Sequence, residues 1–175
     1  LSGLVGSEMC IRDRFNRKKY EQDAVNLYRS TNTAILSTMS KKYEGYPFGS
    51  FITYATDKSR TLFMYTSDIA QHTKNLKNDS KACVTLFKLD TEYDKQNSSR
   101  LTLMGDLKKV PKDDLDDCQE RFVKFLPESK KYSSMHDFKF YKLEISRVRW
   151  IGGFGDIAWI NPCLLYTSPS PRDQR

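Results

Sequence analysis

The chain has 175 residues, with 29 Lys or Arg against 22 Asp or Glu, which gives a formal net charge of +7. This length suits one domain with its own hydrophobic core. No run approaches the roughly 18 consecutive apolar residues of a transmembrane helix, and the basic residues are interleaved with acidic ones instead of forming a nucleic-acid-binding patch. We therefore expect no membrane and no nucleic acid as partners. The positive excess better suits a small anionic ligand.

Both ends of the chain are predicted to be translated sequencing adapters. One coding of Cys163 to Ser168 has a reverse complement that, read in a shifted frame, encodes Met9 to Asp13, as one inverted DNA element would. We therefore expect residues 1–14 and 163–175 to be non-native, and residues 15–162 to form a single domain truncated at both ends. Without these tails, which hold four basic and three acidic residues, the net charge is +6. The compartment stays open, with the cytoplasm as the default.

The first part of the domain reads as a helix followed by strands. Residues 18–31 are predicted to form an amphipathic helix, because Ala24, Leu27 and Tyr28 recur at helical spacing. Residues 33–40 read as the first strand. The segments SFITYAT and TLFMYT, joined by the polar turn DKSR, indicate a hairpin.

A polar helix is predicted next, over residues 68–78, with Ser67 or Asp68 as its N-cap. Its expected buried face consists of Ile69, Thr73 and Leu76. The segment KACVTLFKL that follows is typical of a strand.

The remaining part adds strands and one further helix. RLTLMGDLKKV reads as a strand, and residues 111–127 as a helix whose apolar stripe makes Cys118 a core residue and not a nucleophile. That stripe consists of Leu115, Cys118, Phe122, Phe125 and Leu126. Residues 137–146 and 147–153 complete six or seven strands. Tight turns between strands, with few helices, predict an antiparallel sheet or barrel with helices outside it.

The N-terminus of the polar helix is the first candidate binding site, because its free N–H groups suit a phosphate or carboxylate. Gln71, His72 and Lys74 could add hydrogen-bond donors, and Thr66 and Ser67 could add hydroxyl groups. An ordinary solvated helix is the alternative, and composition alone favours it. Only two histidines occur, without a metal-ligand spacing, and no nucleophile motif is visible, so neither a metal site nor a catalytic residue is predicted.

The segment RWIGGFGDIAWI, residues 149–160, contains three of the six glycines of the domain within four residues. Glycine lets the backbone approach a ligand closely, and the flanking Trp150, Phe154 and Trp159 could stack on a flat ring. A barrel corner packed with core aromatics is an equally good alternative. The segment GYPFGSF, which contains Ser50, could likewise line a ligand or simply form the entry to a strand.

The order of four segments resembles the pyridoxamine-5'-phosphate-oxidase-like, FMN-binding split-barrel superfamily: AILSTMSKKYEGYPFGSFITYA, SDIAQHTKNLKNDSKACVTLF, RLTLMGDLKKV and FKFYKLEISRVRWIGGFGDIAWI. The likeness is greatest to its haem-utilisation branch, whose members carry P-F-G-S, a D-x-A-x-H-T-x-N-L helix and an I-G-G-F-G segment. The resemblance extends over residues 33–160.

This resemblance implies a mainly β fold with flanking helices (α+β), namely a six-stranded antiparallel split β-barrel of the FMN-binding type. It also implies a homodimer with the cofactor at the subunit interface. The oxidase pattern T-N-x-x-S-R-K-x-x-x-L, placed on residues 66–76, implies a site for the FMN phosphate, and Trp150 matches a flavin-contacting tryptophan. The implied cofactor-binding residues are Ser50, Thr66, Ser67, Gln71, His72, Thr73, Lys74 and Trp150.

Departures from the oxidase pattern narrow the function. The arginine and histidine that contact pyridoxal in the oxidases are absent from FGDIAWI, and Gln71 and His72 replace two phosphate-binding residues. We therefore predict an FMN-dependent oxidoreductase of unknown substrate that is not a pyridoxamine-phosphate oxidase. One alternative is a haem-binding or haem-degrading protein, whose haem ligand the resemblance assigns to a C-terminal segment. The other is a flavin-free dimeric binding module.

Overall fold

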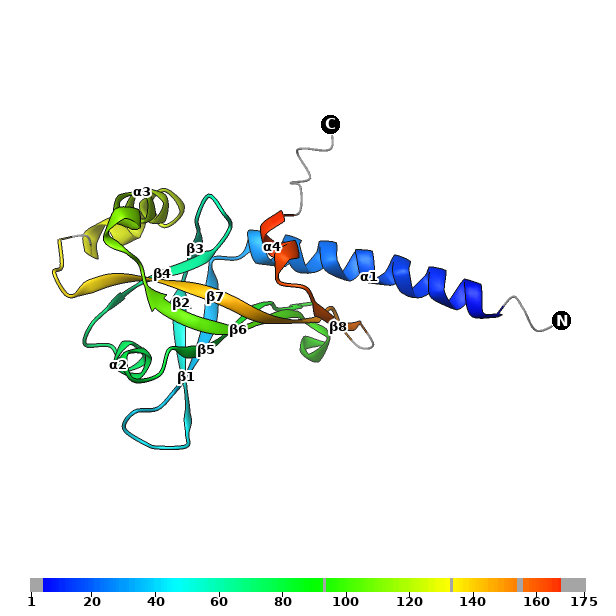
Figure 1. Cartoon of the computed structure of the whole chain (residues 1–175), viewed down its shortest axis with the longest axis horizontal. Helices are drawn as coiled ribbons and strands as arrows, with labels where there is room; N and C mark the ends of the chain where they lie inside the picture. The colour runs from blue at the N-terminus through cyan, green and yellow to red at the C-terminus, as the bar shows by residue number, and fades with distance from the viewer. Residues whose placement is uncertain (1–4, 93, 133, 154–155, 168–175) are drawn as a thin grey trace.

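The computed structural model describes residues 5–92, 94–132, 134–153 and 156–167. Eight strands in this part of the chain form one antiparallel sheet, which curls into a half-barrel with helices around it (Figure 1). The strands are β1 (Thr33–Met39), β2 (Pro47–Thr53), β3 (Ala55–Thr56), β4 (Leu62–Ser67), β5 (Lys81–Lys88), β6 (Ser99–Lys109), β7 (Phe138–Ile151) and β8 (Ile157–Ile160). The helices are α1 (Val5–Ser30), α2 (Gln71–Asn78), α3 (Leu115–Phe125) and α4 (Cys163–Thr167), with the 3-10 helices η1 (Lys95–Asn97), η2 (Lys112–Asp114) and η3 (Pro127–Tyr132).

The strand order is β2-β1-β5-β6-β7-β4-β3, and β8 pairs with the end of β7. β7 connects the two parts of the sheet, because its 14 residues pair with β4, β6 and β8. The predicted antiparallel half-barrel with flanking helices is confirmed, but the count of six strands is wrong. The two additional strands, β3 and β8, have only two and four residues, too few for a readable alternation.

α1 packs its apolar stripe against the inner face of the sheet. Leu27 and Tyr28 are buried there, in one core cluster with Leu36 of β1 and Val84 of β5. The helix predicted over residues 18–31 is therefore confirmed. None of the described helices combines the length and the hydrophobicity that a membrane span requires.

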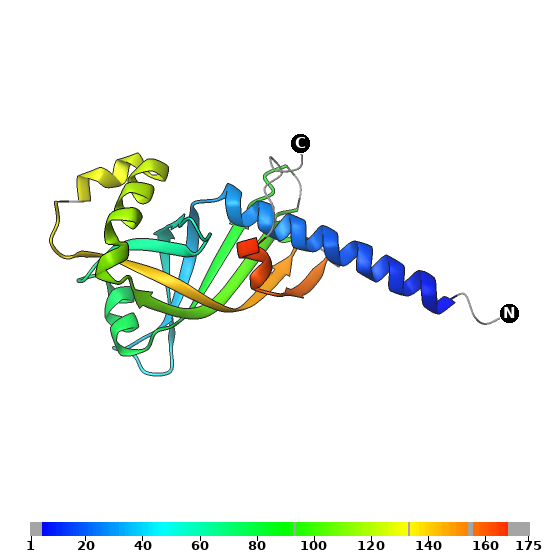
Figure 2. The same cartoon turned by 45° about the horizontal axis from the view of Figure 1, so that its top comes forward.

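Two described elements reach into the tails that are predicted to be non-native. α1 begins at Val5, and its first half extends beyond the sheet (Figure 2). α4 places Leu165, which has no exposed surface, in the main core. The adapter origin of residues 1–14 and 163–175 stays a prediction.

The predicted hairpin is only partly right. β2 pairs with β1, so only β3 forms a ladder with β4, around a turn at residues 57–61. The chain leaves β2 at Tyr54, which is buried and whose hydroxyl lies 2.7 Å from that of Thr31. In the turn, Arg60 has a φ of 65°, and the Asp57 carboxylate accepts from the N–H of Thr61 (2.8 Å). The turn therefore closes a ladder of two residue pairs instead of a long hairpin.

β7 joins the two strands predicted between residues 137 and 153 into one, with a β-bulge between them. Across the bulge, Met104 pairs with Arg147 and Gly105 with Ile145. Ser146 therefore has no partner in the ladder, and its hydroxyl donates to the carbonyl of Met104 (3.1 Å). A Cβ atom on Gly105 would lie 2.0 Å from the backbone oxygen of Glu144, so only glycine allows the strands to approach this closely.

A second, smaller core lies under α3. Cys118 and Phe122 pack there against Phe63 and Phe140, with the ring centroids of the three phenylalanines 5.7–5.8 Å apart. The prediction that Cys118 is a core residue is confirmed. Phe125, which was predicted for the same stripe, is instead 52% exposed.

Candidate ligand-binding site

α2 begins at Gln71, three residues later than predicted, because the chain first continues its pairing with the start of β7. The N–H of Asp68 donates to the carbonyl of Asp137 (2.8 Å), and the Ser67 hydroxyl donates to the Asp137 carboxylate. Ala70 is the N-cap and no side chain caps the helix, so the predicted cap at Ser67 or Asp68 is wrong. The first N–H groups of α2 are therefore open, with no acidic residue in the first turn.

His72 lies in a small pocket between β2, β4 and α2, which we call the α2 pocket. Its Nε2 is 2.6 Å from Oγ1 of Thr66, which in turn lies 3.1 Å from Oγ1 of Thr73. Burial lowers the pKa of His72 from its usual value, so the imidazole is neutral near pH 7. The pocket measures about 220 Å³ and is lined by Phe51, Ile52, Thr53, Met64, Tyr65, Thr66 and His72. These groups can hydrogen-bond an anion but add no positive charge.

The other residues predicted for the phosphate lie close to α2. The Gln71 amide donates to Oδ1 of Asn75 (2.9 Å), whereas the Lys74 side chain is exposed. Ser50 pairs with the buried Leu36, so it points to the inner side of β2, the strand that contacts α2. Seven of the eight predicted cofactor-binding residues thus lie on or beside α2. That they bind a cofactor stays a prediction.

Asn75, which the sequence reasoning missed, fixes α2 to the sheet. Its buried side chain accepts from the N–H of Lys41 (3.0 Å) and from Nε2 of Gln71 (2.9 Å), and donates to Oγ1 of Thr38 (3.0 Å). Ile69, predicted for the buried face, is instead 74% exposed. An asparagine in a polar helix is normally solvated, so composition held no signal for its burial; the one available signal was its place in the D-x-A-x-H-T-x-N-L pattern.

Trp150 lies apart from these residues. It is 2% exposed and lines a different pocket, about 370 Å³, between α1 and the ends of β5, β6 and β7. Thr66 pairs with Lys139, so roughly 35 Å of strand separates that pair from Trp150 along β7. Within a single chain, Trp150 therefore does not lie at the α2 pocket. Phe154 and Gly155, which were also predicted near the flavin ring, lie outside the described residues.

The outward side of the sheet, which we call the outer face, is a second candidate site. Successive register partners from six strands form one row across it, namely Phe51, Ile35, Thr85, Thr102, Arg149 and Trp159. The described helices contribute to the cores on the other side of the sheet or at its ends. Seven large apolar side chains therefore stay 36–68% exposed on the outer face: Ile35, Met39, Phe51, Phe87, Met104, Ile157 and Trp159. Exposed apolar surface of this extent is typical of a binding surface.

Three arginines, Arg100, Arg147 and Arg149, stand on the outer face without an ion-pair partner among the described residues. The Arg149 guanidinium lies over the ring of Trp159, 5.0 Å from its centroid, and the other two donate to backbone carbonyls. β1, β2, β5, β8 and the adjoining halves of β6 and β7 contain no Asp or Glu. The face thus combines apolar surface with uncompensated positive charge, which suits a flat, anionic, largely apolar ligand.

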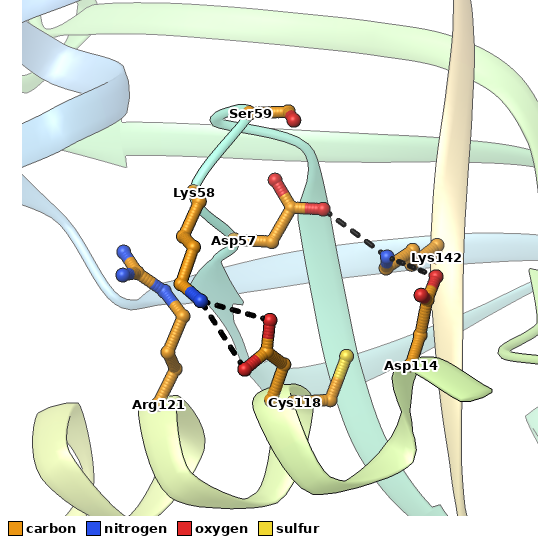
Figure 3. A pocket seen from close by; sticks show the side chains of 8 residues that line it. Asp57, Lys58, Ser59, Asp114, Cys118, Arg121 and Lys142 are labelled. Carbon is orange, nitrogen blue, oxygen red and sulfur yellow. Dashed lines mark hydrogen bonds and ion pairs between the residues drawn. The ribbon is translucent and has the colours of Figure 1, made fainter. Parts of the chain in front are cut away.

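A further pocket, between the β3–β4 turn and α3, is charged but neutralised internally (Figure 3). Its ion pairs are Lys142–Asp57 (3.2 Å), Lys142–Asp114 (3.0 Å) and Lys58–Asp117 (3.0 Å). Arg121 donates to the carbonyl of Thr56 (3.0 Å). Three cations face three carboxylates, so this pocket fastens α3 to the turn and offers an anion no net charge.

The half-barrel and its open outer face define the chain as a split-barrel protein. Residues 16–168 match the family described as CREG, beta-barrel, and the chain belongs to this family. The predicted relationship to the pyridoxamine-5'-phosphate-oxidase-like proteins is confirmed for the fold, and the assignment to the haem-utilisation branch stays a prediction.

Two relatives with recognisable sequence similarity are described as heme proteins. The chloroplastic heme oxygenase HOZ of Arabidopsis thaliana is 34% identical over 119 residues, which cover 68% of this chain and 36% of that protein. The chain therefore spans about a third of the length of this curated relative. The structure of a heme binding protein from Mycobacterium smegmatis has a TM-score of 0.75 at 28% identity, covering 84% of this chain and 60% of that chain.

A more distant structure shares the fold alone. A Listeria innocua chain assigned as a pyridoxamine 5'-phosphate oxidase has a TM-score of 0.57 at 16% identity, covering 76% of this chain and 98% of that chain. This comparison therefore bears on the fold and not on a cofactor.

Proposed function

We propose that this chain is a haem-binding protein whose haem lies on the outer face of the sheet. The observation that carries the proposal is the outer face itself, a broad apolar surface with three arginines and with no Asp or Glu in β1, β2, β5, β8 and the adjoining halves of β6 and β7. The similarity to two relatives described as heme proteins supports it.

The residue types of the outer face fit haem, which is a flat, largely apolar molecule with two carboxylates at one edge. Ile35 and Phe51 offer exposed apolar surface to the ring system. Arg147 and Arg149 can hold the carboxylates through charge-assisted, bidentate hydrogen bonds. Because Arg149 already lies over the Trp159 ring, less of its side-chain freedom is lost on binding.

The outer face offers few candidate ligands for the haem iron. Bound haem supplies redox and oxygen chemistry, which its axial ligand tunes. Cys83 lies on the outer face, but burial raises the pKa of its thiol and so disfavours the thiolate. His72 lies in the α2 pocket and His136 in an exposed turn, so neither belongs to the face. The proposal is therefore restricted to haem binding and includes no turnover.

A homodimer through the outer face forms part of the proposal, with the ligand at the interface. Seven exposed large apolar side chains on one sheet face are more than a monomer normally leaves in water. A second copy of the face would cover them and enclose the haem between two apolar surfaces.

FMN is the second candidate, favoured by the open N-terminus of α2. The phosphate would lie among Ser50, Thr66, Ser67, Gln71, His72, Thr73 and Lys74, with Trp150 at the ring. Two observations oppose this site: the Asp137 carboxylate that accepts from Ser67 would repel a phosphate, and Trp150 is buried. For this reason we place haem first.

Titration of the purified chain with haem tests the proposal. We expect saturable binding with a Soret band that differs from that of free haem. Arg149→Gln should lower the affinity about tenfold or more, because it removes a charge-assisted hydrogen bond. Lys124→Gln, the loss of an exposed charge on α3, is the matched control and should leave the affinity unchanged. An unaltered Soret band at excess haem refutes haem binding.

A parallel titration with FMN tests the second candidate. If the phosphate lies in the α2 pocket, His72→Ala should weaken FMN binding, because the imidazole then no longer donates to it. A preparation that stays colourless with excess FMN excludes this candidate. A colourless dimer that takes up neither cofactor supports the flavin-free binding module.

A further inference from the structure

We infer that the pocket between α1 and the ends of β5, β6 and β7, which we call the α1 pocket, binds a free α-amino acid. This inference goes beyond the proposed function, because the α1 pocket lies on the inner side of the sheet, whereas the haem is placed on the outer face. It assigns a ligand class to a buried indole and to four charged side chains that neither candidate cofactor explains.

The indole nitrogen of Trp150 is a buried donor without an acceptor. The residue is 2% exposed, and its Nε1–H has no hydrogen-bond partner among the described residues. Trp150 is also one of the residues that line the α1 pocket. A buried donor that stays unpaired costs free energy, and an acceptor supplied by a ligand in this pocket removes that cost.

Gly152 leaves this side of the indole without a covering side chain. A Cβ atom built on Gly152 would lie 3.0 Å from Nε1 of Trp150 and 3.3 Å from the Cβ of Asp156. All three residues line the α1 pocket, whose volume of about 370 Å³ falls within the range of small-molecule sites. The donor of Trp150 and the side chain of Asp156 therefore stand close together at one wall of the pocket.

The α1 pocket carries charges of both signs. Lys19 and Asp23 stand one turn apart on α1, while Lys88 ends β5 and Asp156 precedes β8. None of the four forms an ion pair within the described part of the chain. Asp156 is instead held by the hydroxyl of Tyr20, which donates to its Oδ1 (3.0 Å). In contrast to the pocket under α3, where cations and carboxylates neutralise one another, this pocket suits a ligand that carries both signs.

An α-amino acid matches this arrangement, because its ammonium and its carboxylate are attached to one carbon. The carboxylate can accept from Nε1 of Trp150 and from the ammonium of Lys88. The ammonium of the ligand can donate to the carboxylates of Asp156 and Asp23. A simple anion or a simple cation satisfies only half of these groups, so the pocket should discriminate against both.

Isothermal titration calorimetry with the proteinogenic L-amino acids, one at a time, tests the inference. At least one of them should bind with a Kd of about 1 mM or below. Its amide, which lacks the carboxylate, and its N-acetyl derivative, which lacks the ammonium, should each bind about tenfold more weakly or worse. If no amino acid binds, or if the three forms bind equally well, the inference is overturned.

Substitutions place the ligand in the α1 pocket. Asp23→Asn removes one charge and keeps the shape of a half-buried side chain, so it should lower the affinity about tenfold. Asp116→Asn, the same change at an exposed position of α3, is the matched control and should bind like the parent chain. An affinity in Asp23→Asn that equals the parent's contradicts the inference.

Trp150→Phe keeps an aromatic ring but removes the N–H. It should also weaken binding about tenfold, whereas an indole with a merely structural role predicts a lower Tm and an unchanged affinity. If this variant does not fold, Asp23→Asn and its control still decide the question.

Haem separates this inference from the proposed function. The two ligands should bind independently, because the outer face and the α1 pocket lie on opposite sides of the sheet. An amino acid that binds while haem causes no Soret change leaves the inference standing and removes the haem proposal. An amino acid that displaces haem overturns its placement in the α1 pocket.

Discussion

The side chain of Asn75 attaches α2 to the sheet, so substituting it measures how much this attachment contributes to stability. Its amide joins three otherwise separate elements: Thr38 in β1, Lys41 in the loop after β1, and Gln71 in the first turn of α2. Asn75→Ala removes all three hydrogen bonds and leaves the hydroxyl of Thr38, which is 2% exposed, without this partner.

The magnitude follows from these contacts. Three hydrogen bonds contribute about 1 kcal/mol each, and the desolvated Thr38 hydroxyl adds about 1 kcal/mol more, so Asn75→Ala should cost about 4 kcal/mol of unfolding free energy. For a chain of this size, that corresponds to a fall in Tm of about 8–16 °C. Gln71→Ala removes only one of the bonds and should cost about 1 kcal/mol.

Equilibrium unfolding in urea, followed by tryptophan fluorescence, gives both values. A cycle of Asn75→Ala with Thr38→Val should show a coupling energy of about 1 kcal/mol or more, because the two side chains bond directly. A loss below about 1 kcal/mol for Asn75→Ala would refute the reasoning that this amide holds α2.

Three further predictions concern stability. Gly105→Ala should lower the free energy of unfolding in urea by about 3 kcal/mol, because the new Cβ would meet the backbone oxygen of Glu144. Gly49→Ala is the control: its Cβ would have no other atom within 4 Å, so the free energy of unfolding should change by less than about 0.5 kcal/mol. An equal loss at both positions would contradict the close contact. Burial lowers the pKa of His72 in the folded chain, so the unfolded chain binds the proton first as the pH falls. The contribution of His72 to the free energy of unfolding should therefore be fully present above about pH 6.5 and decline as the pH falls through that value. His72→Gln should flatten this decline in urea midpoints compared at about pH 7.5 and pH 5.5, and an unchanged slope would show that other groups cause it. Burial raises the pKa of Tyr54 to about 12, so stability should fall as the pH rises from about 10 toward that value, and Tyr54→Phe should lessen the fall in alkaline denaturation followed by circular dichroism.

Most strands could be predicted because one of their faces is buried. β1, β5 and β6 alternate buried and less buried residues over most of their lengths, and that alternation is visible in the sequence. The predicted hairpin was only partly right because alternation says where a strand lies but not which strand it pairs with. The choice of β1 as the partner of β2 depends on contacts between distant segments.

Only the part of the candidate site whose residues are neighbours in sequence could be predicted. The α2 residues are neighbours in sequence, so a helix N-terminus could be proposed from them directly. The arginines of the outer face could not be recognised in this way, because Arg147 and Arg149 alternate with buried residues like ordinary solvated charges. Their importance depends on the register of β6, β7 and β8, which sets Arg149 beside Trp159 and leaves both without a covering helix.

The bulge at Ser146 decides which residues of β7 point to the outer face and which point to the core. Before it Leu143 points inward, and after it Trp150 points inward while Arg147 and Arg149 point outward, so odd-numbered positions change sides within the strand. If Ser146 joined the ladder as an ordinary strand residue, regular alternation would turn both arginines toward the apolar interior and Trp150 toward the water, whereas loss of the Ser146 codon would leave all three on their present sides. The bulge therefore accommodates one extra residue, while the regular segments on both sides of it keep their apolar side chains toward the core.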